Sequence, residues 1–417
     1  MLEVQSPGRP VSGTVRPPGS KSLTNRALVT AALARPGASR LYGVLEADDS
    51  RAMVEGLRHL GVLIDDNEDP WLVLGTGGDL QPAAATIDVG ASGTTARFIT
   101  AVAALASGPT TIDGTPRMRE RPIGPLTGAL RALGADVEAT DGFPPVRIGE
   151  GTGLRGGKVR IDSTRSSQFA SALLLVAPLA AEPVEIELDG PVVSRSYLQG
   201  TVEVMEAFGG EVTVEGDTYR VEPTGYSKSQ YTIEADASAA VYPAVAAAIT
   251  GGSVLIQGIP PGSSQPDLAV LEILVRMGCS VGHDSDGLTV TGSGKLAAFE
   301  ADFTEAPDGA LAMAVAALFA DGPSRLSGLS TLGIKETDRL AALQIELSRL
   351  GAGARVEGDT LVVEPAPLHP ATVETYGDHR MAMSFALVGL VVSGVRISDA
   401  TVVTKTWPGY FAMLESL

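Results

Sequence analysis

Basic residues recur where apolar, helix-forming segments of this sequence begin. Lys21 and Arg26 lie in the first turns of one such segment, Arg97 in those of a second and Arg380 in those of a third. A cation at a helix N-terminus opposes the helix dipole, which is unfavourable unless an anion is bound there. Helix N-termini also offer free backbone N–H groups to anions. The pattern therefore predicts a site for a small anionic ligand.

The same segments carry polar residues at their starts, and these have a second explanation. Ser, Thr and Asp cap helices by accepting hydrogen bonds from the first backbone N–H groups. Capping accounts for the hydroxyls and carboxylates but not for the added cations, so both readings stay open. The polar starts are Ser20-Lys21-Ser22, Ser92-Gly93-Thr94-Thr95, Ser166-Ser167-Gln168, Asp236-Ala237-Ser238, Asp308-Gly309 and Asp378-His379-Arg380.

Further charges precede several amphipathic segments. A single charged cluster is usually a solvated face. Several clusters at matching positions favour a site instead. The residues concerned are Arg117, Arg119 and Arg121 in TPRMRERPIG, Lys335, Glu336, Asp338 and Arg339 in IKETDRL, and Lys405 in TKTWPGY.

Two series of segments repeat along the chain and must position these charges. Six Ala-rich runs begin near residues 22, 93, 167, 237, 309 and 380, which are 70 to 74 residues apart. They are apolar on every face, which is typical of buried helices. Five amphipathic runs end in a glycine, a helix C-terminus signal because glycine adopts the left-handed conformation without a steric clash. These glycines are Gly61, Gly134, Gly209, Gly278 and Gly351.

The chain is therefore predicted to contain six α/β repeats of about 70 residues, the sixth truncated after its strand. Each repeat is expected to form a buried helix, a strand, an exposed helix and short strands. Three repeats make a plausible large domain, so we expect two domains of three repeats each. One long domain with accidental periodicity is the alternative. If three buried helices start at one place, they create a local positive potential.

Composition excludes several classes of protein. Asp and Glu number 49 against 31 Lys and Arg, a net charge of −18, which disfavours nucleic-acid and membrane-surface partners. Cys279 is the single cysteine and is expected to be a small buried residue, so no internal disulfide forms. The histidines lack metal-ligand spacing, and no metal is expected. We expect a cytoplasmic protein without a membrane span.

Seven motifs in order along residues 17–410 resemble those of the 5-enolpyruvylshikimate-3-phosphate synthases: PGSKSLTNRAL, SGTTAR, PRMRERPIGPL, SSQFASALL, KETDRL, GDHRMAM and KTWPGY. The resemblance implies the two-domain enolpyruvyl transferase fold, with six βαβαββ-type repeats and buried parallel helices whose N-termini converge. It implies one domain of residues 21–235, a second of residues 1–20 plus 236–417, and an active site in the cleft between them.

The resemblance also implies the reaction. The enolpyruvyl group of phosphoenolpyruvate is transferred to the 5-hydroxyl of shikimate 3-phosphate, with release of phosphate, by addition and elimination through a tetrahedral intermediate. The reaction belongs to the shikimate pathway of aromatic amino acid biosynthesis. It needs a base, an acid and cations that hold the anionic substrates. No cofactor is implied, and we expect a monomer.

Matching the motifs residue by residue gives the expected site. Lys21 should touch both substrates, and His379 is an additional polar candidate. Asp308 is the candidate base at the 5-hydroxyl and Glu336 the candidate proton donor to the methylene carbon, with the division of proton transfers among Lys21, Asp308 and Glu336 left open. Shikimate 3-phosphate should contact Lys21, Ser22, Arg26, Ser166, Ser167, Gln168, Ser194, Tyr197, Asp308 and Lys335. Phosphoenolpyruvate should contact Lys21, Gly93, Arg121, Gln168, Arg339, Arg380 and Lys405.

Structural explanations stay open for some of these residues. Asp308 could be only a helix cap. Ser194 and Tyr197 could simply close a loop. Lys335 and Glu336 could be first-turn charges of a helix. Arg117 and Arg119 are expected to be solvated or to lie behind the site.

Three positions depart from the family pattern. Ala91 stands where Asn is usual, Phe98 where several members have Pro, and Thr331 where some relatives have Asn near the substrate phosphate. Gly93 is retained, so no methyl group fills the slot beside the expected phosphate. We therefore expect glyphosate to compete with phosphoenolpyruvate.

Two rival functions remain. UDP-N-acetylglucosamine enolpyruvyl transferases normally have Lys-Asn at the first motif and a cysteine in the loop, whereas this chain has Lys21-Ser22 and Arg119-Glu120-Arg121. A non-catalytic relative that only binds ligands would need no such set of charged residues. Turnover of the substrates would distinguish an enzyme from a relative that only binds them.

Overall fold

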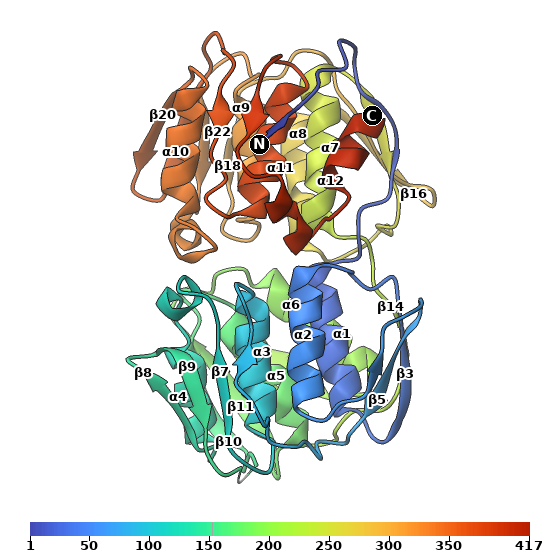
Figure 1. Cartoon of the computed structure of the whole chain (residues 1–417), viewed down its shortest axis with the longest axis vertical. Coiled ribbons are helices and arrows are strands. Elements are labelled where there is room, and N and C mark those ends of the chain that lie inside the picture. Colours follow the sequence, from blue (N-terminus) through green and yellow to red (C-terminus); the bar gives the residue numbers. More distant parts are fainter. Residues whose placement is uncertain (152) are drawn as a thin grey trace. The chain divides into compact units, whose positions relative to one another are not determined.

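The computed structural model describes residues 1–151 and 153–417. The chain forms two compact units, one of Gly19–Ile233 and one of Met1–Pro18 together with Glu234–Leu417 (Figure 1). We call them the 19–233 unit and the 234–417 unit, the latter including residues 1–18. The six-repeat α/β organisation predicted from the sequence is confirmed, with three repeats in each unit.

The 19–233 unit has three repeats of a buried helix, a strand, a second helix and a hairpin. Its helices are α1 (Lys21–Leu33), α2 (Asp48–His59), α3 (Gly93–Ala103), α4 (Gly124–Ala132), α5 (Gln168–Val176) and α6 (Ser196–Ala207), with short 3-10 turns η1 (Met118–Glu120) and η2 (Ala177–Leu179). Its strands are β3 (Gly37–Tyr42), β4 (Ile64–Asp65), β5 (Trp71–Gly75), β6 (Ile87–Asp88), β7 (Thr110–Asp113), β8 (Val137–Thr140), β9 (Phe143–Ile148), β10 (Gly157–Asp162), β11 (Val184–Asp189), β12 (Val212–Glu215), β13 (Thr218–Val221) and β14 (Gln230–Thr232).

The 234–417 unit repeats this plan. Its helices are α7 (Ala237–Thr250), α8 (Ala269–Arg276), α9 (Ala310–Ala317), α10 (Arg339–Arg349), α11 (His379–Gly389) and α12 (Tyr410–Ser416), with 3-10 turns η3 (Pro266–Leu268), η4 (Ser330–Ile334) and η5 (Thr401–Lys405). Its strands are β1 (Leu2–Glu3), β2 (Ser12–Val15), β15 (Ser253–Ile256), β16 (Ser280–Asp284), β17 (Gly287–Thr291), β18 (Glu300–Asp302), β19 (Ser324–Ser327), β20 (Gly353–Glu357), β21 (Thr360–Glu364), β22 (Thr372–Val373) and β23 (Arg396–Ile397).

Each repeat has its own small sheet, in which a parallel pair is extended by an antiparallel hairpin. The 19–233 unit has the strand orders β14-β3-β5-β4, β6-β7-β9-β8 and β10-β11-β13-β12. The 234–417 unit has β2-β15-β17-β16, β18-β19-β21-β20 and the three-stranded β1-β23-β22. In the last sheet β1 takes the place of the hairpin that the sixth repeat lacks, by pairing antiparallel with β23.

Two strands, β2 and β14, pair with strands that are distant in the sequence. Strand β2 precedes α1 but pairs parallel with β15, from Ser12 opposite Ser253 to Val15 opposite Ile256. Strand β14 precedes α7 but pairs parallel with β3, where Gln230 lies opposite Arg40. Each unit is therefore completed by a strand that the chain supplies just before it passes to the other unit.

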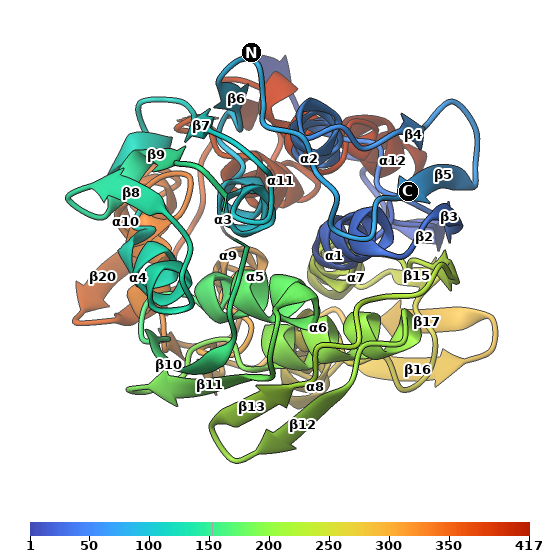
Figure 2. The same ribbon diagram turned by 90° about the horizontal axis from the view of Figure 1, so that it is seen from below.

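Helices fill the centre of each unit. Helices α1, α3 and α5 contact one another in the 19–233 unit (Figure 2), and α7, α9 and α11 do so in the 234–417 unit. Every residue of α3, α9 and α11 is buried, which confirms the prediction from their all-round apolar sequence. Their many alanines let neighbouring helices approach closely, so the polar residues at their starts are held on rigid elements.

The predicted helix ends are also confirmed. The five glycines of the amphipathic segments all have positive φ, between 80° and 105°, just after α2, α4, α6, α8 and α10. The sequence analysis missed one helix, α12, after the strand of the sixth repeat. It forms because Tyr410, Leu414 and Leu417 lie on one side and are buried. Cys279 is buried, as expected. Among the described residues, no helix is long and apolar enough to cross a bilayer.

The close packing of the alanine-rich helices predicts a large asymmetry between two substitutions in the 234–417 unit. Ala314 in α9 is fully buried, whereas Ala412 in α12 is exposed. Overpacking a filled core costs about 1–3 kcal/mol, so Ala314→Leu should lower the free energy of unfolding by that amount. Ala412→Leu should leave it nearly unchanged. Urea unfolding measures both, and equal midpoints would show that α9 is not tightly packed.

Candidate functional site

The guanidinium of Arg339 is the centre of a charged cluster in the 234–417 unit. Its Nε donates to Asp378 Oδ2 at 2.7 Å, and its Nη1 donates to Asp308 Oδ1 at 2.9 Å. Its Nη2 donates to Glu336 Oε2 at 2.9 Å and to Asp378 Oδ1 at 3.2 Å. The side chain is only 1% exposed. One buried cation therefore holds three carboxylates in fixed positions.

Three more cations complete this cluster. Arg380 Nη2 lies 2.9 Å from Asp308 Oδ2, and Lys335 Nζ lies 3.7 Å from Asp308 Oδ1. Lys405 Nζ lies 3.6 Å from Glu336 Oε1. The structure thus joins by ion pairs all six residues predicted for this part of the site. They are Asp308, Lys335, Glu336, Arg339, Arg380 and Lys405.

The local elements explain why these side chains converge. Asp308 lies one residue before Gly309, the N-cap of α9. Lys335 and Glu336 lie between η4 and Asp338, whose side chain caps α10 by accepting from Ala341 N–H. Their ion pairs therefore form before the helix, and not within its first turn. The starts of α9, α10 and α11 meet at the cluster.

Burial and charge act in opposite directions on the arginines. Burial alone would lower the pKa of Arg339, but Asp378, Glu336 and Asp308 raise it above its usual value. Burial likewise lowers the pKa of Arg380, but Asp308 raises it, and the net result is a pKa above the usual value. Both side chains are thus held as cations. Behind them, burial and then the nearby Asp308 charge raise the pKa of the Asp267 carboxyl to about 6. Its Oδ2 accepts a hydrogen bond from Ser238 Oγ.

In the 19–233 unit, Arg121 is a buried cation with unused hydrogen-bonding capacity. It is 7% exposed, and within the described ranges its one hydrogen bond is a long one from Nη1 to Ala91 O at 3.4 Å. Its guanidinium lies against Gly93 at the start of α3, where an added Cβ would be 2.4 Å from Nη2. A fork of free donors beside helix N–H groups suits an anion.

Arg26 is in the opposite situation. It is 2% exposed, and burial lowers its pKa to about 10. Its Nε donates to Thr201 Oγ1 at 2.7 Å, and its Nη1 donates to Ser22 Oγ at 2.7 Å. Its Nη2 donates to Tyr197 O at 3.1 Å and Ser171 Oγ at 3.2 Å. The structure thus places Arg26 where it joins α1, α5 and α6 and orients Ser22.

The remaining predicted residues of this unit lie at the same helix starts. Lys21 Nζ lies 3.2 Å from Asp49 Oδ2 at the start of α2. Gln168 Nε2 donates to Thr94 Oγ1 at 3.3 Å, which joins the starts of α5 and α3. Ser166 Oγ accepts from Gln168 N–H, and Ser167 is the N-cap residue of α5.

Ser194 and Tyr197 form the turn into α6. Ser194 is buried and has a φ of 55°, an uncommon conformation for a residue other than glycine. The Tyr197 N–H donates to Ser194 O. The loop-closing role considered for these residues is therefore seen, and a ligand-binding role remains a prediction.

The other basic residues of the η1 loop do not join Arg121. Arg117 pairs with Glu120 at 2.8 Å, and Arg119 pairs with Asp113 at 2.6 Å on the surface. The solvated reading of these two arginines is therefore supported. At the three positions that depart from the family pattern, Ala91 O accepts from Arg121, the Phe98 ring lies 5.4 Å from the Arg26 guanidinium, and Thr331 is buried in η4.

Sequence reasoning missed three contributors. It treated Asp378 only as a helix start and did not foresee its ion pair with Arg339. It did not consider Asp49, although two acidic residues at the start of α2 were a visible signal. It also missed that Arg97 Nη2 donates to Pro122 O at 2.5 Å and so holds the loop after Arg121.

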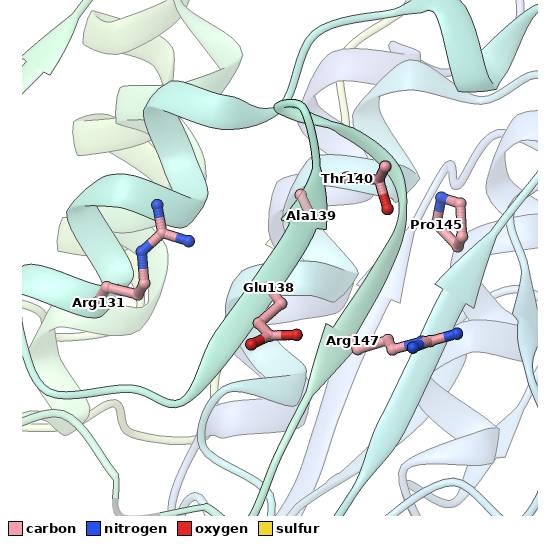
Figure 3. A pocket seen from close by; sticks show the side chains of 6 residues that line it. All are labelled: Arg131, Glu138, Ala139, Thr140, Pro145 and Arg147. Carbon is pink, nitrogen blue, oxygen red and sulfur yellow. The ribbon is translucent and has the colours of Figure 1, made fainter.

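A surface hollow of about 400 Å³ lies elsewhere in the 19–233 unit (Figure 3). It is lined by Arg131 of α4, Glu138, Ala139 and Thr140 of β8, and Pro145 and Arg147 of β9. Glu138 and Arg147 are exposed cross-strand neighbours, and no predicted site residue lines the hollow. Among the described residues, no group of three or more His, Cys, Asp and Glu side chains could hold a metal ion.

Comparisons with known proteins agree on one family. The family model for EPSP synthase (3-phosphoshikimate 1-carboxyvinyltransferase) matches residues 5–414. The 3-phosphoshikimate 1-carboxyvinyltransferase of Rhizobium leguminosarum bv. trifolii is 42% identical over 426 residues, which cover 100% of this chain and 97% of the relative. That of Methanoculleus marisnigri is 43% identical over 410 residues, which cover 97% and 96%.

A solved structure leads to the same family. The EPSP synthase structure from Acinetobacter baumannii has a TM-score of 0.83 to this chain at 25% sequence identity, and the match covers 99% of this chain and 97% of that one. The two-domain fold expected from the motifs is thereby confirmed. The chain belongs to the EPSP synthase family.

Proposed function

We propose that the protein transfers the enolpyruvyl group of phosphoenolpyruvate to the 5-hydroxyl of shikimate 3-phosphate and releases phosphate. The observation that carries this proposal is the cluster at Arg339, where Arg339, Arg380, Lys335 and Lys405 surround the carboxylates of Asp308 and Glu336. The reaction needs cations for anionic substrates and, beside them, groups that accept and donate protons. This cluster supplies both.

The two units contribute different parts of this chemistry. In the 234–417 unit, Arg339, Arg380 and Lys405 are proposed to bind the carboxylate and phosphate of phosphoenolpyruvate. In the 19–233 unit, Arg121 and the N–H groups beside Gly93 are proposed to bind its phosphate, because Arg121 makes only one long hydrogen bond within residues 1–151 and 153–417. Preorganised cations stabilise developing negative charge without reorganisation during the reaction.

The shikimate 3-phosphate contacts rest on the polar helix starts. The polar residues at the start of α1 are Lys21 and Ser22. Those at or just before the start of α5 are Ser166, Ser167 and Gln168. Tyr197 and Ser194 are proposed to contact the same substrate, with Lys335 and Asp308 from the 234–417 unit. Arg26 supports this set by holding Ser22 and the Tyr197 carbonyl. We assign it a positioning part in addition to any direct contact.

The proton transfers are assigned to the carboxylates of the Arg339 cluster. Asp308 is proposed as the base that takes the proton of the 5-hydroxyl, since Arg339 and Arg380 fix both of its oxygens. Glu336 is proposed to deliver a proton to the methylene carbon, since it lies between Arg339 and Lys405. Lys21 is the third group proposed to take part. Each assigned carboxylate is held in one orientation, as proton transfer requires.

Other features belong to the same proposal. We take the two compact units as the two domains of the fold, with boundaries close to the expected 21–235 and 236–417 plus 1–20. We propose a cytoplasmic monomer that needs no nucleic acid, membrane or cofactor. The net charge of −18 disfavours nucleic-acid and membrane-surface partners, and the single buried cysteine is typical of a reducing compartment.

Phosphate release by the purified protein tests the function. Release should require both phosphoenolpyruvate and shikimate 3-phosphate, and omission of either should abolish it. Glu336→Gln removes the proposed proton donor at nearly constant shape and should lower kcat by about a hundredfold or more. Release with UDP-N-acetylglucosamine as the acceptor would identify the rival transferase. Tight binding of shikimate 3-phosphate without release would identify a silent relative.

Arg339→Lys tests whether the planar fork is needed. A lysine cannot contact three carboxylates at once, so the cluster loses its geometry although the charge is kept. We expect kcat/KM to fall by about a hundredfold to a thousandfold, the loss typical of a preorganised charge-stabilising donor. Arg325→Lys, at an exposed ion pair with Glu357 in the same unit, should change kcat/KM less than about twofold. Equal effects of the two substitutions would contradict the assignment.

Gly93→Ala tests the slot beside Arg121. The new methyl group would meet the Arg121 guanidinium, which must move, so the KM for phosphoenolpyruvate should rise by about fivefold to thirtyfold, or 1–2 kcal/mol. Glyphosate should compete with phosphoenolpyruvate in the unsubstituted enzyme and should bind more weakly to the variant. Gly128→Ala in α4 has open space around it and serves as the control. Unchanged turnover of the unsubstituted enzyme in millimolar glyphosate would refute the expected competition.

A further inference from the structure

A further buried carboxylate, Glu346, lies on α10 and is not among the proposed substrate contacts. The Glu346 side chain is fully buried, and a buried charge is costly unless it is paired and hydrogen-bonded. Glu346 Oε2 accepts from Arg349 Nε at 2.8 Å and from the Glu374 backbone N–H at 3.2 Å. Its Oε1 accepts from the Tyr376 hydroxyl at 2.7 Å and from Arg349 Nη2 at 3.3 Å. Two of the three residues that donate to Glu346, Glu374 and Tyr376, belong to the segment that leads to α11.

That segment, residues 374–378, has an unusual conformation. Tyr376 has a φ of 54°, which is a genuine outlier for a bulky residue and is energetically unfavourable. Gly377 follows with a φ of 68°, so the chain makes a left-handed turn just before Asp378. Such a turn persists only where its surroundings hold it. The bond from the Tyr376 hydroxyl to Glu346 is the side-chain contact that Tyr376 itself makes to hold it, beside the backbone bonds from Glu374 N–H to Glu346 and from Thr375 N–H to Ser398 Oγ.

The same segment ends in a residue on which both arginines of the cluster depend. Asp378 binds the Arg339 guanidinium through both oxygens, and its Oδ1 also accepts from the Arg380 backbone N–H at 2.8 Å. Arg339 and Glu346 are seven residues apart on α10, about two helical turns, and therefore lie on one face. Helix α10 thus contacts the segment at two points along that face, through Arg339 to Asp378 and through Glu346 to Tyr376.

We propose that Glu346 and Tyr376 are positioning residues for phosphoenolpyruvate binding, which act by fixing Asp378 and through it Arg339 and Arg380. The proposal rests on the proposed function, since it takes these two arginines as the groups that bind phosphoenolpyruvate. Without the Glu346 contact the left-handed turn can relax. Asp378 then shifts, and the guanidinium groups lose the alignment that a two-pronged anion contact needs.

Tyr376→Phe is the most direct test, because it removes one hydroxyl. Tyr376 is 40% exposed, so the variant should fold. Substitutions that act on a site through intervening residues change binding by about 0.5–2 kcal/mol, so the KM for phosphoenolpyruvate should rise between about twofold and thirtyfold. The KM for shikimate 3-phosphate should change less than about twofold. A loss of folded enzyme would lower the apparent kcat and leave both KM values in place.

Tyr226→Phe is the matched control. Its hydroxyl likewise donates one hydrogen bond, to Leu175 O at 3.0 Å, but in the 19–233 unit. It should lower stability without changing either KM. Glu346→Gln keeps the shape and one acceptor oxygen, so it should recover part of the phosphoenolpyruvate affinity that Glu346→Ala loses. In a double-mutant cycle, Glu346→Gln should have a smaller effect when Tyr376 is already Phe.

Two outcomes would overturn the proposal. One is an unchanged KM for phosphoenolpyruvate in both Tyr376→Phe and Glu346→Ala; the other is an equal rise for both substrates. Hydrogen exchange of residues 370–385 provides a readout independent of turnover, and it should speed up in Tyr376→Phe but not in Tyr226→Phe. If the unsubstituted protein has no turnover, the proposed function fails, while faster exchange in Tyr376→Phe would still show that the Tyr376 hydroxyl helps to hold the segment.

Discussion

A single buried guanidinium imposes the strictest constraint on the 234–417 unit. Arg339 is almost inaccessible to solvent, and its charge is balanced by Asp308, Glu336 and Asp378, which precede three different helices. Removing one partner of a buried ion network leaves an uncompensated charge, which is far costlier than losing a surface pair. The starts of α9, α10 and α11 are therefore fixed relative to one another by charge balance as well as by apolar packing.

The two units use buried arginines in contrasting ways. Arg26 donates from all three of its nitrogens to protein acceptors, so it stabilises the 19–233 unit itself. Arg121, which is also buried, has one long hydrogen bond in the described part of the chain and lies beside helix N–H groups. A cation left with free donors is costly in an empty protein and useful when an anion binds. The protein thus contains local sites of positive charge although its net charge is −18.

Helix starts serve both structure and chemistry here. Asp338 and Asp378 cap α10 and α11 through their own side chains, as ordinary capping requires. Asp378 also binds Arg339, so one carboxylate ends a loop, begins a helix and aligns a cation. The alanine-rich helices behind these starts pack too closely to move independently. The packed helices therefore fix the positions of the charged side chains at their N-terminal ends.

The sequence by itself determined the six repeats, the buried helices, the glycine-terminated amphipathic helices and the family, because periodicity, caps and motifs are local properties of the chain. It also identified the charged residues of the Arg339 cluster except Asp378, which it treated only as a helix start. Only the tertiary structure decided which charges pair. Asp378 reaches Arg339 across 39 residues, Tyr376 reaches Glu346 across 30, and β2 and β14 pair outside their own repeats. Such contacts depend on packing geometry between distant elements, which no local pattern encodes.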